Sequence, residues 1–263
     1  MKKIIFSRIV LGLIAALPII LVSPATAHAQ LNRKPLSRAD SAAAIRSFMS
    51  AAGGNGFQYI YYSTSDWKIG GKDSVSRDTL SVAFTDTHNT CTDLSMLGVK
   101  TRILGRAASP SYTLWIYPQT KNYSLRVQDT ASAMANDRRT YQVTKIGAET
   151  VNGYRCIHSR LTTIGPRGKS SAVIQDIWTS TDIPGYGVIR QMMTLQNVTP
   201  KILQALEQGG CSGAFVKMTM QSSVISSSTI LIRADAANLP ASLFQLPSGY
   251  TPASGGGFLG AVM

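Results

Sequence analysis

The chain has 263 residues, of which 44% are hydrophobic, and its 26 Lys and Arg outnumber its 13 Asp and Glu, so the net charge is +13. A chain of this length can bury a core that needs no disulfide or metal staples, and beyond the N-terminal region no apolar run is long enough to span a membrane. The positive charge favours anionic partners. The basic residues are scattered and not interleaved with aromatic residues, so the pattern excludes a nucleic-acid reader, and we expect no nucleic-acid partner.

The N-terminal segment has the features of a secretory signal peptide. A basic start at residues 2–8 precedes the apolar stretch Ile9–Val22, and Ala27-His28-Ala29 fits the small-x-small rule of a signal peptidase. We therefore predict a leader over residues 1–29, cleavage before Gln30 and a mature charge of +10, because the leader holds three of the basic residues and none of the acidic ones. A retained anchor is the alternative. The sequence indicates an exported protein of the periplasm or outer envelope of a bacterium.

The mature chain is predicted to form a single β-rich domain over residues 30–250, followed by a flexible tail over residues 251–263. Its first element is a helix over Ser37–Ala52, in which Ile45, Phe48, Met49 and Ala52 are spaced as one helical face and Gly53-Gly54 marks the end. Short β-prone runs separated by turn residues follow, with a tight turn at Gly70-Gly71. The first predicted strands are Phe57–Ser63, Thr79–Thr85, Val99–Leu104 and Tyr112–Pro118.

The second half alternates strands with short helices. The Ala-rich stretch Asp129–Arg139 is predicted as a short helix, and Thr199-Pro200 as the start of another, because threonine caps a helix and proline suits its first turn. Gly209-Gly210 ends this second helix. The predicted strands of this half are Tyr141–Ile146, Tyr154–Thr163, Val173–Ser180, Phe215–Gln221 and Thr229–Arg233, before a turn at Leu239–Leu246. About ten short strands with few helices indicate an antiparallel, β-dominated α+β fold.

Several stretches of the second half resemble an uncharacterised family of bacterial envelope proteins. They are Val143–Cys156, Ile177–Thr179, Asp182–Tyr186, Gly210–Met218 and Leu243–Tyr250. This family is related to the periplasmic lipoprotein-localisation carriers. The resemblance implies a curved antiparallel sheet that forms a half-open barrel, with a few short helices packed against it. The helix Ser37–Ala52 leading into Phe57–Ser63 resembles the opening of such a carrier, and the family provides no catalytic residues to transfer.

The most informative side chains for function are aromatic and alternate along strands. Tyr59 and Tyr61, together with Phe57, lie at alternate positions of one predicted strand, Trp115 and Tyr117 of another, and Trp178 on a third. Alternate positions share a face of a sheet, so each set can line one side. In a closed core these rings are packing, whereas in a half-open barrel they form a cavity for acyl chains, with Lys and Arg at the rim facing a phosphate or carboxylate headgroup.

Catalytic and metal sites are not indicated. Gly210-Cys211-Ser212-Gly213 fails the nucleophile-elbow pattern and fits a helix C-cap better. His88 and His158 have no ligand partners at metal spacing. We therefore expect no catalytic residue, no metal and no cofactor.

The mature chain has three cysteines, Cys91, Cys156 and Cys211, in a compartment that permits disulfides. If strand Phe215–Gln221 runs antiparallel to Val173–Ser180, Cys156 and Cys211 both lie at strand starts on one rim, and we predict a bridge between them. Two alternatives are a bridge that uses Cys91 and three buried, reduced thiols.

The sequence thus predicts a non-enzymatic, monomeric envelope protein that binds or shields a lipid or other amphipathic molecule in a concave β surface. An anionic membrane surface or another envelope protein is a further expected partner. The alternatives are a structural or interaction module whose concavity is filled by its own helices, and a hydrolase with a site assembled from distant residues.

Overall fold

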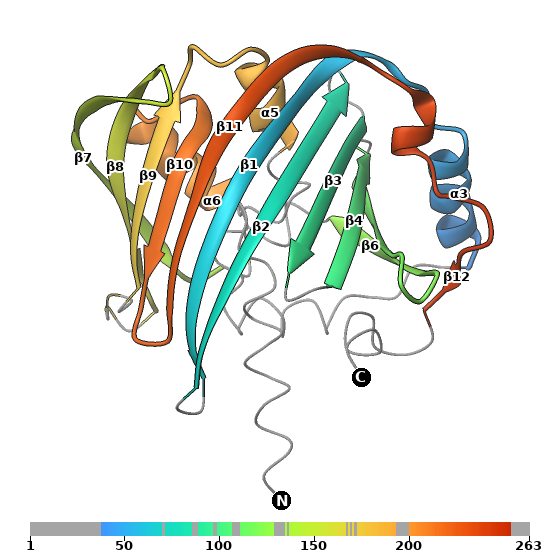
Figure 1. Ribbon diagram of the computed structural model, residues 1–263, viewed down its shortest axis with the longest axis horizontal. Coiled ribbons are helices and arrows are strands. Elements are labelled where there is room, and N and C mark those ends of the chain that lie inside the picture. The colour runs from blue at the N-terminus through green and yellow to red at the C-terminus, as the bar shows by residue number, and fades with distance from the viewer. Residues whose placement is uncertain are drawn as a thin grey trace, which may run out of the picture.

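The computed structural model describes residues 38–69, 72–85, 89–96, 99–106, 111–128, 135, 137–166, 168, 170, 173–192 and 200–253. These residues build one long, curved sheet with a small number of helices (Figure 1). The predicted β-dominated fold is confirmed. None of the helices in this part of the chain is both long and apolar enough to cross a membrane.

The sheet has twelve strands in the order β12-β6-β5-β4-β3-β2-β1-β11-β10-β9-β8-β7. Their bounds are β1 Gly54–Ile69, β2 Lys72–Thr85, β3 Asn89–Met96, β4 Val99–Arg106, β5 Ser111–Tyr117, β6 Asn122–Gln128, β7 Thr140–Val151, β8 Tyr154–Ile164, β9 Ile174–Ser180, β10 Ala214–Gln221, β11 Ile225–Leu239 and β12 Thr251–Pro252. Most neighbours are joined by hairpins, and the first strand β1 pairs with β11, the last long strand, in the middle of the sheet.

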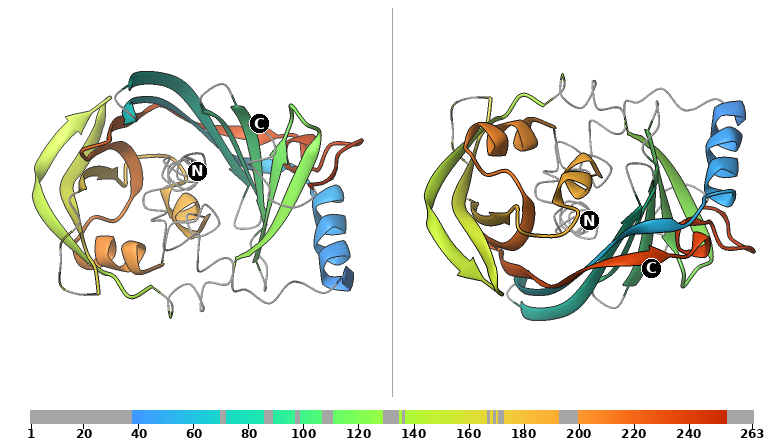
Figure 2. Two further views of the ribbon diagram at one scale, coloured as in Figure 1. Left: turned by 90° about the horizontal axis from the view of Figure 1, so that it is seen from below. Right: turned by 90° about the horizontal axis from the view of Figure 1, so that it is seen from above.

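The helices are α3 Arg38–Met49, α5 Tyr186–Met192, α6 Pro200–Gln208 and the 3-10 helix η2 Ala241–Phe244. Figure 2 shows α5 and α6 inside the curve of the sheet and α3 outside it, beyond β6. We call the inner side the concave face and the outer side the convex face. α3 and η2 cover the convex face of β2–β6, where Phe48 and Phe244 pack on Leu104 and Leu114.

On the concave face, α6 packs its buried residues Ile202 and Leu206 against Leu161 and Ile177 of β8 and β9. The loop before α5 and α5 itself contribute Ile183 and Ile189 to a second cluster, which also holds Tyr59 and Leu80. α6 therefore stabilises one end of the curved sheet from the concave face, and α3 stabilises the other end from the convex face.

Several local predictions are confirmed. The helix expected over Ser37–Ala52 is α3, and the helix expected at Pro200 is α6. The turn Asn152-Gly153 joins β7 to β8 with both residues at positive φ, 47° and 83°, which asparagine and glycine tolerate best. β10 runs antiparallel to β9, as expected.

Other predictions need correction. The three longest strands, β1, β2 and β11, have 14 to 16 residues and are not short. The sheet is not purely antiparallel, because β12 pairs with β6 in parallel. β12 also places Thr251 and Pro252 in the sheet rather than in a loose tail. The sequence did not predict α5. The turn at Gly70-Gly71, the leader and most of the helix expected over Asp129–Arg139 lie outside the described residues.

Candidate ligand-binding face

Four aromatic residues singled out from the sequence share the concave face: Tyr59, Tyr61, Trp115 and Tyr117. Tyr59 and Tyr61 are two residues apart on β1 and pair with Val82 and Leu80 of β2. Following the ladders across β3 and β4 leads to Trp115, which is opposite Ile103. Tyr117 lies two residues further along β5 and has the same orientation. The concave side of the five neighbouring strands β1–β5 therefore carries an aromatic and aliphatic surface.

These four side chains are packed. Tyr59, Tyr61, Trp115 and Tyr117 are at most 7% exposed. The Tyr59 hydroxyl donates to the Pro184 carbonyl at 2.5 Å, and the Tyr61 hydroxyl donates to the Phe215 carbonyl at 3.2 Å. Burial raises the pKa of both phenols above the ordinary value, so both remain neutral hydrogen-bond donors. These two rings therefore add no ionised group to the concave surface near β1.

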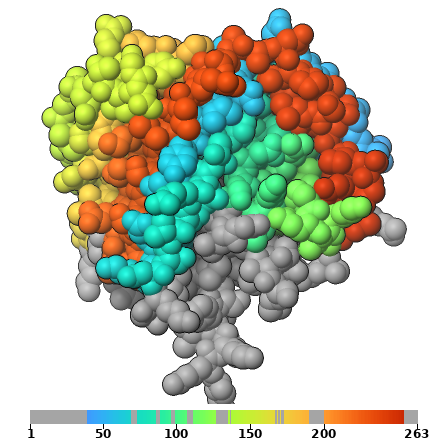
Figure 3. All heavy atoms as spheres, in the orientation of Figure 1, coloured from blue at the N-terminus to red at the C-terminus, as the bar shows by residue number. Residues whose placement is uncertain are grey.

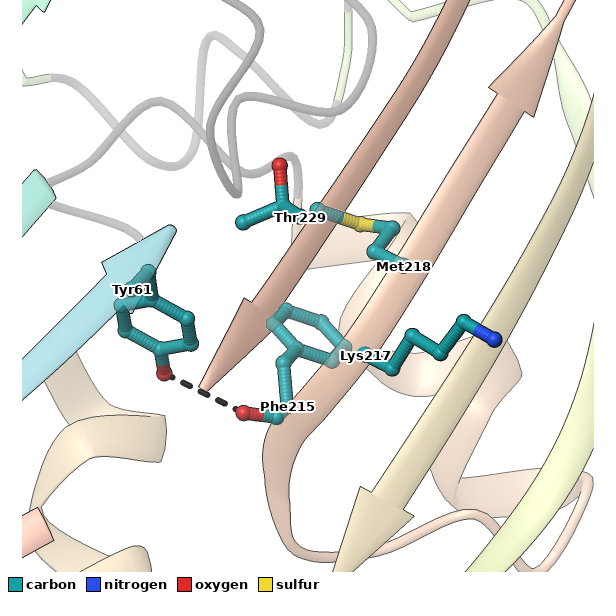
Figure 4. Close-up of a pocket in the computed structure, with 5 residues that line it drawn as sticks. All are labelled: Tyr61, Phe215, Lys217, Met218 and Thr229. Atoms are coloured by element: carbon teal, nitrogen blue, oxygen red, sulfur yellow. Dashed lines mark hydrogen bonds between the residues drawn. The ribbon is translucent and has the colours of Figure 1, made fainter. Parts of the chain in front are cut away.

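A small pocket opens on this face between β1, β10 and β11. Its lining residues are Tyr61, Phe215, Lys217, Met218 and Thr229, and its volume is about 10 Å³, which is room for about one water molecule. Figure 4 shows the Tyr61 ring pointing toward Phe215 and the Lys217 side chain extending away from Tyr61. The pocket is smaller than the 300 to 1,000 Å³ that is typical of small-molecule sites. An alkyl chain needs more room than this pocket provides in the present conformation.

Trp178 is on the other face of the sheet. Ile177 pairs with Met218, and Met218 pairs with Thr229. Thr229 lies two residues from Leu231, which pairs with Tyr61. Ile177 therefore shares the concave face, and its neighbour Trp178 faces outward. Trp178 therefore does not share the strand face of Tyr61, although it belongs to the same buried cluster as Tyr59 and Tyr61.

Trp178 instead forms the centre of a polar cluster on the convex face. The His158 ring stacks on the indole with a centroid distance of 4.0 Å, and the Lys217 ammonium lies 4.5 Å above the ring. The indole N–H donates to Glu149, whose carboxylate also lies 3.3 Å from His158 Nδ1. His158 therefore stacks on Trp178, a contact that the sequence did not reveal.

Arg126 is a residue that sequence reasoning missed. It lies opposite Thr113 in the ladder of β5 and β6, and its guanidinium carbon is 3.8 Å from the centre of the Trp115 ring. Alternation along Asn122–Gln128 could have placed Arg126 on the face of Trp115. No sequence signal, however, showed which arginine would lack an acidic neighbour.

The predicted Cys156–Cys211 bridge is not present: Cys91, Cys156 and Cys211 are all free and buried. Cys211 contacts the Ser159 hydroxyl at 2.7 Å, whereas Cys156 lies three residues earlier on β8 and has the opposite orientation. The two thiols therefore lie on opposite sides of β8. The predicted strand pairing is correct, but the two cysteine side chains point to opposite faces of the sheet and cannot meet.

The segment Gly210–Gly213 is a helix terminus, as the sequence indicated. Gly210 has a φ of 70°, and the Cys211 amide donates to the Leu206 carbonyl at 2.8 Å, a Schellman-type cap of α6. Within the described residues, no group of three or more His, Cys, Asp or Glu is placed to hold a metal ion. His88 lies outside the described residues.

Comparison with known proteins gives one family match. A family model described as "Domain of unknown function (DUF4412)" matches residues 86–250. No curated protein sequence matches the chain.

Several solved structures resemble the chain weakly. A LolA superfamily protein from Nitrosomonas europaea has a TM-score of 0.31 at 10% identity, over 80% of this chain and 98% of that one. The lipoprotein LppX from Mycobacterium tuberculosis has a TM-score of 0.31 at 10% identity, over 74% and 94%. A DUF1329 family protein from Desulfovibrio piger has a TM-score of 0.30 at 11% identity, over 75% and 90%. TM-scores this low carry no conclusion about ligands.

Proposed function

This chain belongs to the family described as Domain of unknown function (DUF4412). From its concave face, we propose that it is a non-enzymatic envelope protein that binds the apolar part of a lipid or another amphipathic molecule. The observation that carries the proposal is the common orientation of Tyr59, Tyr61, Trp115 and Tyr117. Together with Leu80, Val82 and Ile103 they give one side of the sheet a continuous apolar surface.

The placement of the helices supports the concave face as the binding side. α3 and η2 cover the convex side of β2–β6, so that side of the sheet is already packed. On the concave side, α5 is a short helix whose preceding loop is fixed to β1 by the hydrogen bond from Tyr59 to Pro184. Because the pocket at Tyr61 is small, uptake of an alkyl chain requires α5 and its loop to move away from β1.

The two tryptophans Trp115 and Trp178 provide a matched test. They are 4% and 6% exposed, each has a cation above its ring, and they lie on opposite faces. The full chain is titrated with an environment-sensitive fluorescent fatty acid. We expect saturable binding, at least fivefold weaker binding by Trp115→Leu, and unchanged binding by Trp178→Leu. Trp115→Phe, which keeps an aromatic ring, should restore most of the affinity and excludes misfolding as the cause.

The alternative of an interaction module with a filled concavity also has an observation in its favour, because the four rings are buried and the pocket is small. The titration decides between the two functions. Absence of saturable binding, together with absence of co-purifying lipid in native mass spectrometry, would support the module and contradict the lipid-binding proposal.

Export is part of the same proposal and rests on the sequence of residues 1–29. The purified mature protein should begin at or near Gln30 in N-terminal sequencing. Recovery of the protein from the cell envelope with Met1 or Lys2 intact would contradict cleavage.

A further inference from the structure

The concave face has one strongly polar end. Arg126 of β6 lies opposite Thr113 of β5 and next to Trp115, at the end of the curved sheet farthest from α6 (Figure 2). Its guanidinium extends over the Trp115 ring, with 3.8 Å between the guanidinium carbon and the ring centre. This stacking holds the cation on the concave surface rather than in bulk solvent.

The charge of Arg126 has no carboxylate partner in the described part of the chain. The other arginines with short contacts to acids show the contrast: Arg102, Arg139, Arg155, Arg160 and Arg233 each form an ion pair with an aspartate at 2.6 to 2.9 Å. Burial lowers the pKa of Arg126, because the charged form loses water, but a guanidinium remains protonated at neutral pH. A bound anion would compensate this charge.

Two further donors lie on the same face of the neighbouring strands. Trp115 Nε1 and Thr101 Oγ1 are buried, and neither has a hydrogen-bond acceptor among the described residues. Thr101 precedes Arg102, the partner of Ile116, so Thr101 is level with Tyr117 on the concave face. Burial raises the pKa of Tyr117, although the nearby Arg126 lowers it in part, so the phenol keeps its proton. Buried donors without acceptors are uncommon and costly in folded proteins.

We infer that Arg126, Trp115 and Thr101 form an oxyanion site that binds the carboxylate or phosphate headgroup of an amphiphile whose alkyl chain lies on the concave face. The inference rests on the proposed function and names the ligand class for it. A planar guanidinium donates two parallel hydrogen bonds to a carboxylate or phosphate, and the indole N–H and the hydroxyl supply further donors.

The surface between this site and the pocket suits an alkyl chain. Ile103 of β4, Leu94 of β3 and Leu80 of β2 follow one another on the concave face between Trp115 and Tyr61. At ~4.8 Å between neighbouring strands, the path from β6 to β1 is about 24 Å long. An anionic headgroup at Arg126 would therefore direct the chain toward the pocket at Tyr61.

The test compares ligands that share a sixteen-carbon chain and differ in the headgroup. Palmitate, hexadecyl phosphate and uncharged hexadecanol are titrated against the full chain by displacement of the fluorescent fatty acid, and inorganic phosphate is titrated alone. The variant is Arg126→Met, which keeps the stem over Trp115 and removes the charge. Arg160→Met is the matched control, because Arg160 is an arginine on the convex face that forms an ion pair with Asp176. Arg126→Lys tests rescue by charge.

We expect the native chain to bind palmitate and hexadecyl phosphate more tightly than hexadecanol. Arg126→Met should lose about tenfold or more in affinity for the two anions, the range for a hydrogen bond to a charged group, and should keep its affinity for hexadecanol. Arg126→Lys should recover part of the loss, and Arg160→Met should behave as the native chain.

Three results would overturn the inference. Equal affinity for the anions and hexadecanol in both the native chain and Arg126→Met would reject the oxyanion site and leave the proposed function in place. Binding of inorganic phosphate as tight as that of hexadecyl phosphate would reject a lipid headgroup as the ligand. Absence of binding of any sixteen-carbon ligand would reject the proposed function, and the oxyanion site with it.

Discussion

The imidazole of His158 lies parallel to the indole of Trp178, with 12° between the ring planes, on the convex face of β8 and β9. Lys217 covers the indole as well, and Glu149 accepts a hydrogen bond from its N–H. All four residues are on the side of the sheet that faces away from Tyr61. Trp178 therefore stabilises the fold at the β7–β10 end, and its removal should affect stability without affecting a ligand on the concave face.

The first prediction concerns this cluster. Trp178→Leu removes a 6% exposed indole and leaves the hydrogen-bond acceptor Glu149 without its donor, so the free energy of unfolding should fall by about 2 to 4 kcal/mol. Urea unfolding followed by circular dichroism measures the change. A variant as stable as the native chain would show that the cluster is only a surface arrangement.

The second prediction concerns the ion pair between Asp137 and Arg139 at the start of β7. Their side chains are 3% and 13% exposed, and Asp137 also accepts a hydrogen bond from the Tyr141 hydroxyl at 2.7 Å. Asp137→Asn leaves the Arg139 charge buried without its partner, so the free energy of unfolding should fall by about 3 kcal/mol at neutral pH. Asp182→Asn is the control, because its partner Arg155 is 86% exposed, and no measurable change is expected.

The same carboxylate gives a third prediction, on pH. Burial alone would raise the pKa of Asp137, but hydrogen bonds from Arg139 and Tyr141 outweigh it and hold the pKa below the ordinary value. A lowered pKa stabilises the folded state at neutral pH, and this stabilisation is lost as the pH falls below about 4 and through the pKa of the folded state. Unfolding measured from pH 7 to pH 2 should show a smaller acid loss for Asp137→Asn than for the native chain.

Local features of the sequence predicted much of the fold, because they depend on neighbouring residues alone. The proline at the start of α6 and the Asn152-Gly153 turn are examples. Alternation within β1 and within β5 correctly placed each aromatic pair on one side. By contrast, α5 begins after Pro184-Gly185, a sequence typical of a turn, and its stability comes from the burial of Ile189 against the sheet.

The relation between distant strands could not be predicted in the same way. Trp178 faces outward because of the pairing of β9 with β10. This pairing includes a bulge between Phe215 and Lys217, which no residue type in the sequence indicates. The same limitation applies to Cys156 and Cys211, whose strands were paired correctly. A shift of one residue in the register of a strand moves its side chains to the opposite face of the sheet, and the register is set by the pairing of the whole sheet.

The fourth prediction follows from the free cysteines. Because all three are buried, and because burial raises the pKa of the Cys91 thiol to about 12, the reactive thiolate form is scarce. The native protein should react with Ellman's reagent over hours or not at all, and the unfolded protein should release three equivalents without reductant. One equivalent in the unfolded, unreduced protein would instead indicate a disulfide.

The last prediction tests how the loop before α5 is held on the concave face. Gly185 has a φ of 75°, and a Cβ at this position would lie 2.5 Å from the Phe57 ring. Gly185→Ala combines backbone strain with a steric clash, so it should lower the free energy of unfolding by about 1 to 3 kcal/mol.

The adjacent Gly187 provides the control for this prediction, because a Cβ there meets no atom within 4 Å. Gly187→Ala should be neutral or should stabilise the protein by up to about 1 kcal/mol, since alanine favours a helix. Hydrogen exchange measures the local effect: amides of Tyr186–Met192 should exchange faster in Gly185→Ala and not in Gly187→Ala. Because the Gly185 carbonyl accepts hydrogen bonds from Val188 and Ile189 at 3.0 and 3.1 Å, displacement of Gly185 also removes the first turn of α5. Equal exchange in the two variants would contradict a role for the Gly185–Phe57 contact in holding α5 against β1.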